Sequence, residues 1–184
     1  MYHIKADKRV RRSAERMYEG LNRCLEAKSL KEITVSDVCK ESKVGRATFY
    51  RNFDVVSDIL SMKCDQCFKE VLEGFVEHNG DRPFDAKNLL KFYISYWSEN
   101  WKIIDHIVKS NRIDIIYKCH LKNSLIIASK YNPNPHLSEA ERRYLIAMRS
   151  GETISILSTW ILGGRKETAD ELFNIVRKLL FPGQ

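Results

Sequence analysis

The chain of 184 residues has no long apolar run. A membrane-spanning helix needs roughly 18 or more consecutive apolar residues, and the longest runs here fall far short of that length. Residues 1–9 also contain no apolar stretch that could serve as a secretory signal peptide. We therefore expect a cytoplasmic protein that has no membrane partner.

Disulfide and metal-binding patterns are missing too. The five cysteines are an odd count and lack the spacing of a disulfide scaffold. Cys64 and Cys67 form a Cys-x-x-Cys pair, for which a redox or metal-binding role is the alternative to a structural one. The pair lies in a predicted helix, without a preceding strand or a second pair at zinc spacing. We expect free thiols in a reducing compartment and no bound metal.

The sequence motifs of common enzyme classes are absent. It contains no nucleophile elbow, no phosphate-binding loop and no metalloprotease helix. The five histidines are scattered, and the adjacent pair Cys119-His120 cannot face one another on a helix. We expect no catalytic residues, no cofactor and no enzymatic activity.

Strand-like alternation, internal repeats and low-complexity segments are also lacking. Apolar residues recur instead at helical spacing from end to end. Stretches about 8–28, 55–78, 85–97, 101–109, 111–131, 138–162 and 168–180 are predicted helices, and two more lie within 33–53. The expected fold class is all-α with about nine helices. A long fourth helix would join a first domain, residues 1–54, to a second, residues 55–184.

The most informative segment is residues 33–53. Thr34 is a suitable N-cap for a short helix, and Ser42 to Gly45 break that helix. A second short helix begins near Arg46 and buries Phe49 and Phe53, which are spaced i, i+4. Its other face is rich in hydrogen-bond donors and comprises Arg46, Ala47, Thr48, Tyr50, Arg51 and Asn52. Such a helix–turn–helix places side chains in the DNA major groove.

The charge distribution supports an interaction with double-stranded DNA. Residues 1–53 hold 13 basic and 7 acidic side chains, whereas the remaining residues hold 18 and 17. A basic segment joined to a near-neutral body is typical of a DNA-binding protein that has a separate second function. A merely solvated charged surface is the alternative interpretation.

Residues 8 to 62 resemble the amino-terminal domain of TetR-type transcriptional regulators. That family has a pattern of roughly I-T-V-x-D-I-A-x-x-A-G-V-S-x-x-T-F-Y-x-x-F. The matching positions here are Ile33, Thr34, Val35, Asp37, Val38, Val44, Thr48, Phe49, Tyr50 and Phe53. Lys43 replaces the usual turn glycine and Gly45 the usual serine. Val56 stands where members often carry a phosphate-contacting lysine, so that contact does not carry over.

The resemblance also assigns DNA contacts. Arg46 begins the second short helix, where its guanidinium can reach guanine O6 and N7. The family's docking geometry makes Ser36, Gly45 and Ala47 further base-proximal candidates. The family positions that often contact phosphate correspond here to Thr34, Thr48, Tyr50 and Arg51.

The second half is rich in aromatic residues, which can line a small-molecule cavity or simply fill a core. The resemblance implies a cavity, because TetR-type bodies usually enclose an inducer. The residues expected to line it are Phe92, Tyr93, Tyr96, Trp97, Tyr117, His120 and Tyr144.

The last two predicted helices carry apolar stripes that could form a two-fold interface or complete the core of one chain. The residues in these stripes are Ile154, Ile156, Leu157, Trp160, Ile161, Leu172, Phe173, Val176, Leu179 and Leu180. The resemblance implies a homodimer, because this helix pair usually builds a dimeric four-helix bundle in the family.

These observations together predict a transcriptional regulator, and a repressor released from its operator when an effector binds the second domain. The effector is an unknown small molecule. The alternative is a DNA-binding or adaptor module whose second domain binds a protein partner. A body without a ligand cavity would favour that alternative.

Overall fold

The structure is a computed structural model that describes residues 1–4, 7–131 and 134–182. It confirms the all-α prediction, because the described residues form nine α-helices and no strand. Their bounds are α1 (Lys8–Leu25), α2 (Val35–Ser42), α3 (Arg46–Asn52), α4 (Ser57–Asn79), α5 (Ala86–Glu99), α6 (Trp101–Lys109), α7 (Ile113–Tyr131), α8 (Glu139–Leu162) and α9 (Ala169–Leu180). No helix in the described part of the chain is long and apolar enough to cross a membrane.

Local capping fixes where several helices begin. Thr34, Ser138 and Thr168 each accept the backbone N–H three residues ahead, and the acidic side chain at that position accepts from the cap's own N–H. These three capping boxes satisfy backbone donors that a helix N-terminus otherwise leaves without a partner. The starts of α2, α8 and α9 are therefore encoded within four residues each.

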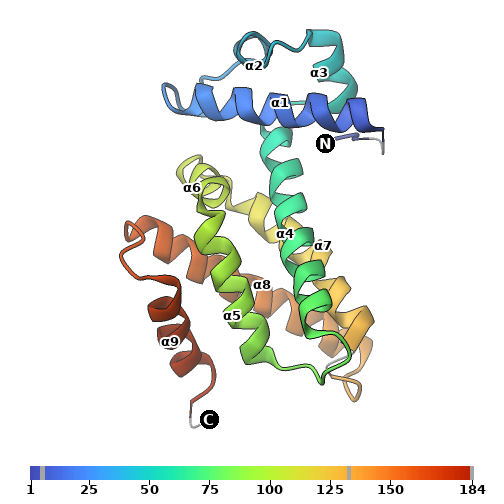
Figure 1. Ribbon diagram of the computed structural model, residues 1–184, viewed down its shortest axis with the longest axis vertical. Helices are drawn as coiled ribbons and strands as arrows, with labels where there is room; N and C mark the ends of the chain where they lie inside the picture. The colour runs from blue at the N-terminus through green and yellow to red at the C-terminus, as the bar shows by residue number, and fades with distance from the viewer. Residues whose placement is uncertain (5–6, 132–133, 183–184) are drawn as a thin grey trace.

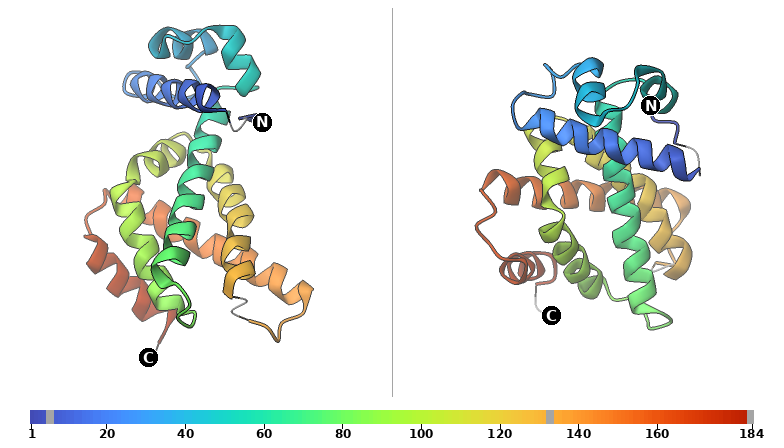
Figure 2. Two further views of the ribbon diagram at one scale, coloured as in Figure 1. Left: turned by 45° about the vertical axis from the view of Figure 1, so that its right-hand side comes forward. Right: turned by 45° about the horizontal axis from the view of Figure 1, so that its top comes forward.

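Helix α4 connects the two halves of the molecule. Helices α1 to α3 form a compact group at one end of α4, while α5, α6 and α7 pack along its remaining length and α9 packs on α5 (Figure 1). The two further views show the same separation, with α5 and α7 on either side of α4 (Figure 2). A continuous helix of 23 residues thus joins the helix–turn–helix to the body.

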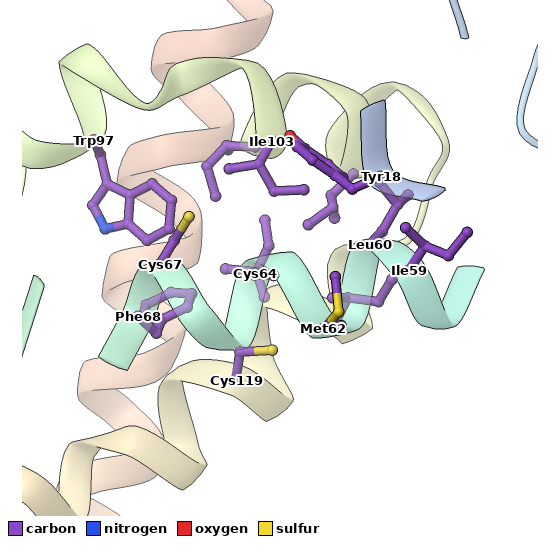
Figure 3. Close-up of a cluster of buried hydrophobic side chains, with 14 of the residues drawn as sticks. Tyr18, Ile59, Leu60, Met62, Cys64, Cys67, Phe68, Trp97, Ile103 and Cys119 are labelled. Atoms are coloured by element: carbon purple, nitrogen blue, oxygen red, sulfur yellow. The ribbon is translucent and has the colours of Figure 1, made fainter. Parts of the chain in front are cut away.

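The buried side chains of α4 serve both halves. Near its start Ile59 is fully buried close to Tyr18 of α1, and further along Phe68 packs on Trp97 of α5 with ring centroids 4.9 Å apart (Figure 3). Cys64 and Cys67 are buried within this cluster (Figure 3). All five cysteines are free thiols, and burial raises the pKa of Cys67.

The apolar stripes of the last two helices mostly complete the core of the single chain. Leu157, Trp160, Ile161, Leu172 and Val176, which the sequence offered for a two-fold interface, are each less than 10 % exposed. Other apolar side chains of these two helices are exposed. They are Tyr144, Met148 and Leu162 of α8 and Ile175 and Leu179 of α9.

Gly20 allows α1 and α2 to approach closely. A β-carbon there would lie 2.8 Å from the Ser42 amide nitrogen and 2.9 Å from Ser42 Cβ. We expect Gly20→Ala to lower the free energy of unfolding by about 1–3 kcal/mol, because the two helices must move apart. Urea denaturation measures the change.

Gly74→Ala is the matched control, because it also lies within a helix but its new β-carbon would meet Phe92 Cζ at an ordinary 3.4 Å. This variant should be as stable as the native protein or up to about 1 kcal/mol more stable, since alanine favours helix. Equal stability of the Gly20 variant and the native protein would contradict the close approach.

Candidate DNA-binding face and body cavity

The turn between α2 and α3 brings the two helices together as a helix–turn–helix. Lys43 ends α2 in the left-handed conformation, with φ 55° and ψ 36°, and its amide donates to the Cys39 and Lys40 carbonyls. Val44 follows and is buried, with 8 % of its surface exposed. Lys43 therefore adopts the left-handed conformation that is readily accessible to glycine. This conformation is sterically unfavourable for lysine, because lysine has a β-carbon.

Helix α3 buries one side and leaves the other open. Phe49 and Phe53 are fully buried, as the sequence predicted, and their ring centroids lie 5.7 Å apart. The open side defines a surface that we call the recognition face. It comprises Ser36 of α2, the exposed residues Gly45, Arg46, Ala47, Tyr50 and Arg51, and half-buried Thr48, with exposed Thr34 at the start of α2.

The expectation that Asn52 belongs to this open side is wrong. Asn52 is only 2 % exposed, and its side-chain amide donates to the Thr48 carbonyl at 2.9 Å. The physical reason is helical phase, because position 52 lies three residues after Phe49 and next to Phe53 on the buried side. Its amide closes the end of α3 instead of facing solvent.

Arg46 and Ser36 connect the two helices of the recognition face. The Arg46 guanidinium donates a hydrogen bond to the Ser36 hydroxyl. An arginine held at the first residue of α3 by a side chain of α2 is restricted in the directions it can take. The other N–H groups of the guanidinium can donate to an acceptor that lies against the recognition face.

Sequence reasoning missed the arginines of α1. Arg23 donates to the Glu41 carbonyl at 2.5 Å, and Arg16 donates to the Lys43 carbonyl at 3.4 Å, so both hold the end of α2 in place. Arg9, Arg11 and Arg12 are exposed near the start of α1. Their signal in the sequence is the basic cluster of residues 8–12, whose charge alone does not show which surface it lies on.

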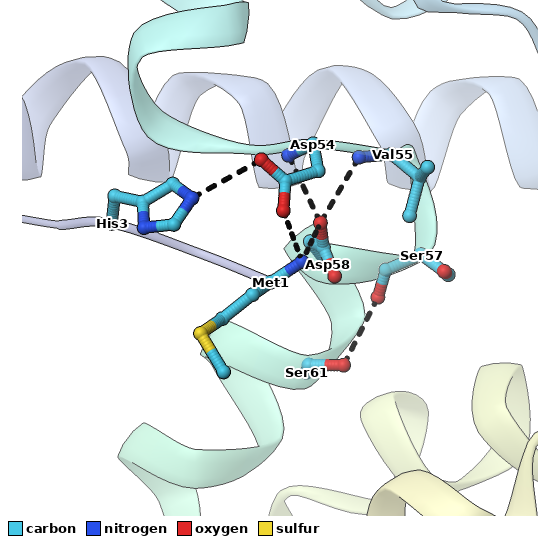
Figure 4. Close-up of polar contacts among 7 residues, drawn as sticks. All are labelled: Met1, His3, Asp54, Val55, Ser57, Asp58 and Ser61. Carbon is cyan, nitrogen blue, oxygen red and sulfur yellow. Dashed lines mark hydrogen bonds and ion pairs between the residues drawn. The ribbon is translucent and has the colours of Figure 1, made fainter.

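Acidic side chains fix the junction between α3 and α4 (Figure 4). One oxygen of Asp58 accepts from the backbone amides of Asp54 and Val55, each at 3.0 Å. Asp54 in turn accepts from the His3 ring at 3.1 Å, and the Met1 amino group lies 2.7 Å from Asp54 and 2.9 Å from Asp58. Residues 1–3 therefore lie against the junction through which α3 is attached to α4.

The body contains a cavity of about 380 Å³ among α4, α5, α7, α8 and the end of α9. Its wall is mainly apolar, and examples from four of these helices are Leu72, Leu90, Ile127 and Ile156. A volume in the range of about 300–1,000 Å³ and an apolar wall with a few polar groups are typical of small-molecule sites.

Only two of the seven residues expected to line the cavity do so, Tyr93 and His120. Trp97 is fully buried in the core against Phe68, and Phe92 packs on Phe75 with ring centroids 5.9 Å apart.

The other three expected residues also lie elsewhere. The Tyr96 hydroxyl donates to Glu70 at 2.9 Å, outside the cavity wall. Tyr117 and Tyr144 are 37 % and 67 % exposed. Aromatic content predicted that the body has large buried rings, but the direction of each ring depends on packing against helices far away in the sequence.

His120 is held at the cavity wall by three hydroxyl groups. Its Nδ1 lies 2.8 Å from the Ser150 hydroxyl and 3.1 Å from the Ser124 hydroxyl, and its Nε2 lies 3.2 Å from the Thr153 hydroxyl. Burial lowers the pKa of His120 to about 4, so the ring is neutral at pH 7.

Comparison with protein-family models and with curated protein sequences finds no match. Solved structures do match over nearly the whole chain. Lin0861 from Listeria innocua is 16 % identical, with a TM-score of 0.78 over 97 % of this chain and 94 % of that one.

Two further structures carry descriptive names. The TetR family repressor AlkX from a Dietzia strain, implicated in biodegradation of n-alkanes, is 13 % identical with a TM-score of 0.54, over 92 % of this chain and 93 % of that one. The fatty acid degradation regulator FadR from Bacillus halodurans is 13 % identical with a TM-score of 0.59, over 97 % of both chains. The chain therefore has the fold of TetR-type regulators, and the resemblance seen in the sequence is confirmed at the level of the fold.

Lys43 provides a test of the turn. We expect Lys43→Gly to raise the free energy of unfolding by about 0.5–1 kcal/mol, because glycine relieves the left-handed strain but gives the unfolded chain more freedom. Lys40→Gly is the control, since Lys40 is exposed within α2 and glycine should cost about 1 kcal/mol in a helix interior. Thermal unfolding followed by circular dichroism measures both, and destabilisation by both variants would contradict the strained turn.

Proposed function

We propose that this chain is a DNA-binding transcriptional regulator that acts in the cytoplasm as a homodimer. The observation that carries the proposal is the recognition face, which combines exposed hydrogen-bond donors with a helix–turn–helix of the kind that enters the major groove. The TetR-type fold supports the same conclusion. The basic excess of residues 1–53 supplies the charge that attracts DNA phosphates.

Within the recognition face we assign two kinds of contact. Arg46 is the base-reading residue, because a guanidinium at the start of the recognition helix can make two hydrogen bonds to one guanine. Ser36, Gly45 and Ala47 are exposed beside it on the recognition face, and we assign them to the bases as well. The groups that position the duplex through its phosphates are Thr34, Thr48, Tyr50 and Arg51, joined by the exposed arginines of α1.

The cavity in the body is the proposed effector site. A body without a cavity would have favoured a protein partner, whereas a space of about 380 Å³ with a mainly apolar wall favours a small molecule. The wall includes residues of α4, which also carries the helix–turn–helix. Residues 1–54 then act as the DNA-binding domain and residues 55–184 as the effector-binding and dimerisation domain.

The proposed mechanism is a coupling between the cavity and the recognition face. A dimer binds two half-sites when its recognition helices lie about 34–36 Å apart, one turn of DNA. An effector that binds better to a different arrangement of the helices shifts the population away from that spacing. The protein then leaves its operator, as a repressor does on induction.

Exposed apolar side chains of α8 and α9 form the proposed dimer interface. On α8, Tyr144, Met148 and Leu162 follow one face, and Gly151 and Ser155 lie between them on the same face. Large exposed apolar residues at this spacing, separated by small ones, permit close approach of a second copy. Ile175 and Leu179 of α9 are exposed in the same way.

The DNA assignment is tested by comparing Arg46→Ala with Tyr50→Phe. Selection from random duplexes supplies the preferred site, and fluorescence anisotropy measures the affinity for it and for unrelated DNA. Arg46→Ala should lose about 1–3 kcal/mol on the preferred site and relax specificity at one position in each half-site. Tyr50→Phe should weaken both duplexes about equally, because phosphate contacts carry no sequence information. Equal weakening of both duplexes by Arg46→Ala would contradict its assignment to bases.

The dimer assignment is tested with Leu162→Glu and Leu179→Glu, two side chains that are each 73 % exposed. Sedimentation equilibrium should give the native chain twice its mass of 21.5 kDa and each variant a shift towards the single chain. Leu125→Glu is the control, since Leu125 is 60 % exposed on α7, outside the proposed interface. A native monomer, or dimers that survive both glutamates, would refute the interface.

A further inference from the structure

Among the described residues of the cavity wall, one buried side-chain hydroxyl makes no hydrogen bond of good geometry. This hydroxyl belongs to Tyr93, of which 8 % is exposed, and its polar neighbours are Trp97 and Thr153. Tyr93 lines the cavity together with His120 and Thr153. A buried hydroxyl without a partner costs free energy, so native proteins retain few of them.

The hydrogen bonds around His120 favour one tautomer of its ring. The Ser124 hydroxyl donates to the His120 carbonyl at 2.7 Å, and the Ser150 hydroxyl donates to the Ile146 carbonyl at 2.8 Å. Both serine oxygens can then only accept from His120 Nδ1, which therefore carries the ring proton. Nε2 is left as an acceptor, and it takes the hydroxyl proton of Thr153.

This assignment shows which hydrogen-bonding atoms around His120 remain unused. The His120 ring is fully engaged, and the Thr153 oxygen keeps acceptor capacity but has given its proton to Nε2. The Tyr93 hydroxyl makes no hydrogen bond of good geometry to the Thr153 oxygen or to any other described acceptor. A ligand oxygen that accepts a hydrogen bond would satisfy it.

The charged side chains of the wall are Arg142, Arg149 and Glu152, all on α8. Arg142 donates to the Leu137 carbonyl at 3.3 Å and lies eleven residues before Thr153, about 16 Å along the helix. Among the described residues of the wall the only carboxylate is Glu152, and it pairs with Arg149 at 2.8 Å. Both side chains of this pair are at least one-third exposed, so the pair lies at the solvent side.

The polar group deeper in the cavity is uncharged, because His120 is neutral and burial keeps Tyr93 protonated by raising its pKa. A charged ligand group beside Tyr93 would lose its hydration without gaining an opposite charge.

We propose that the cavity binds an uncharged, mainly apolar small molecule whose carbonyl oxygen accepts a hydrogen bond from the Tyr93 hydroxyl. This inference rests on the proposed function, in that it takes the cavity as the effector site, and it adds the chemical class of the effector. The apolar wall holds the hydrocarbon part of the ligand, and Tyr93 distinguishes a ketone or ester from a hydrocarbon of the same shape.

Three probes of equal chain length test the charge of the ligand: 2-nonanone, nonanoate and nonylammonium. Isothermal titration calorimetry on the native protein without DNA measures their binding, so the result does not depend on whether the protein recognises an operator. We expect 2-nonanone to bind at least tenfold more tightly than either ion. Equal or tighter binding of an ion, or no binding of the ketones from 2-heptanone to 2-undecanone, would overturn the proposal.

Tyr93→Phe tests the hydrogen bond itself. Its affinity for 2-nonanone should fall about three- to tenfold, the value of one neutral hydrogen bond. Without ligand its melting temperature should stay equal or rise, because the removed hydroxyl makes no hydrogen bond of good geometry. Tyr96→Phe is the matched control, since it removes a hydroxyl from the same helix that contacts Glu70 outside the cavity. Unchanged affinity in Tyr93→Phe, or an equal loss in both variants, would overturn the role of Tyr93.

Failure of the proposed function would give a different experimental result from failure of the proposed effector class. If the chain did not regulate transcription, the selected duplexes would show no sequence preference, whatever the calorimetry of the ketone showed. If only the effector class were wrong, sequence-specific DNA binding would persist while 2-nonanone failed to bind. The two measurements use separate preparations and separate readouts.

Discussion

The burial of α4 along nearly its whole length is the constraint on which the rest of the structure depends. Eleven of its residues are buried, and they contact α1 near its start and α5 and α7 further along. Because one helix contributes to the packing of both halves, neither half can change its orientation without changing contacts in the other. The buried residues at both ends of α4 belong to one continuous core.

Polar contacts reinforce this connection at specific points. Asp65 of α4 accepts from Lys122 at 2.6 Å and from Asn123 at 2.7 Å, and from the Tyr2 hydroxyl. Half-burial alone would raise the pKa of Asp65, but these hydrogen bonds lower it, so the carboxylate is ionised at neutral pH. One side chain thus connects α4 to α7 and to the segment that lies against the junction with α3.

The sequence predicted the features that depend on neighbouring residues. The starts of α8 and α9 and the burial of Phe49 follow from spacing within a few positions. The sequence could not predict which aromatic residues face the cavity, because an apolar stripe has the same spacing whether it packs against another helix or lines a cavity. Asn52 was predictable in principle, since its phase matches that of Phe49, but its polarity suggested the opposite side.

The length of α4 has a mechanical consequence. Twenty-three residues extend about 34 Å at 1.5 Å per residue, so the helix acts as a lever whose far end carries α3. A tilt of about 5° at the cavity end would displace the other end by about 3 Å, close to the 3.4 Å rise between successive base pairs. In the proposed dimer, two such levers moving in opposite directions would double that displacement. A rearrangement of less than one side-chain diameter within the body would then be enough to put the two recognition helices out of step with the grooves of the proposed operator.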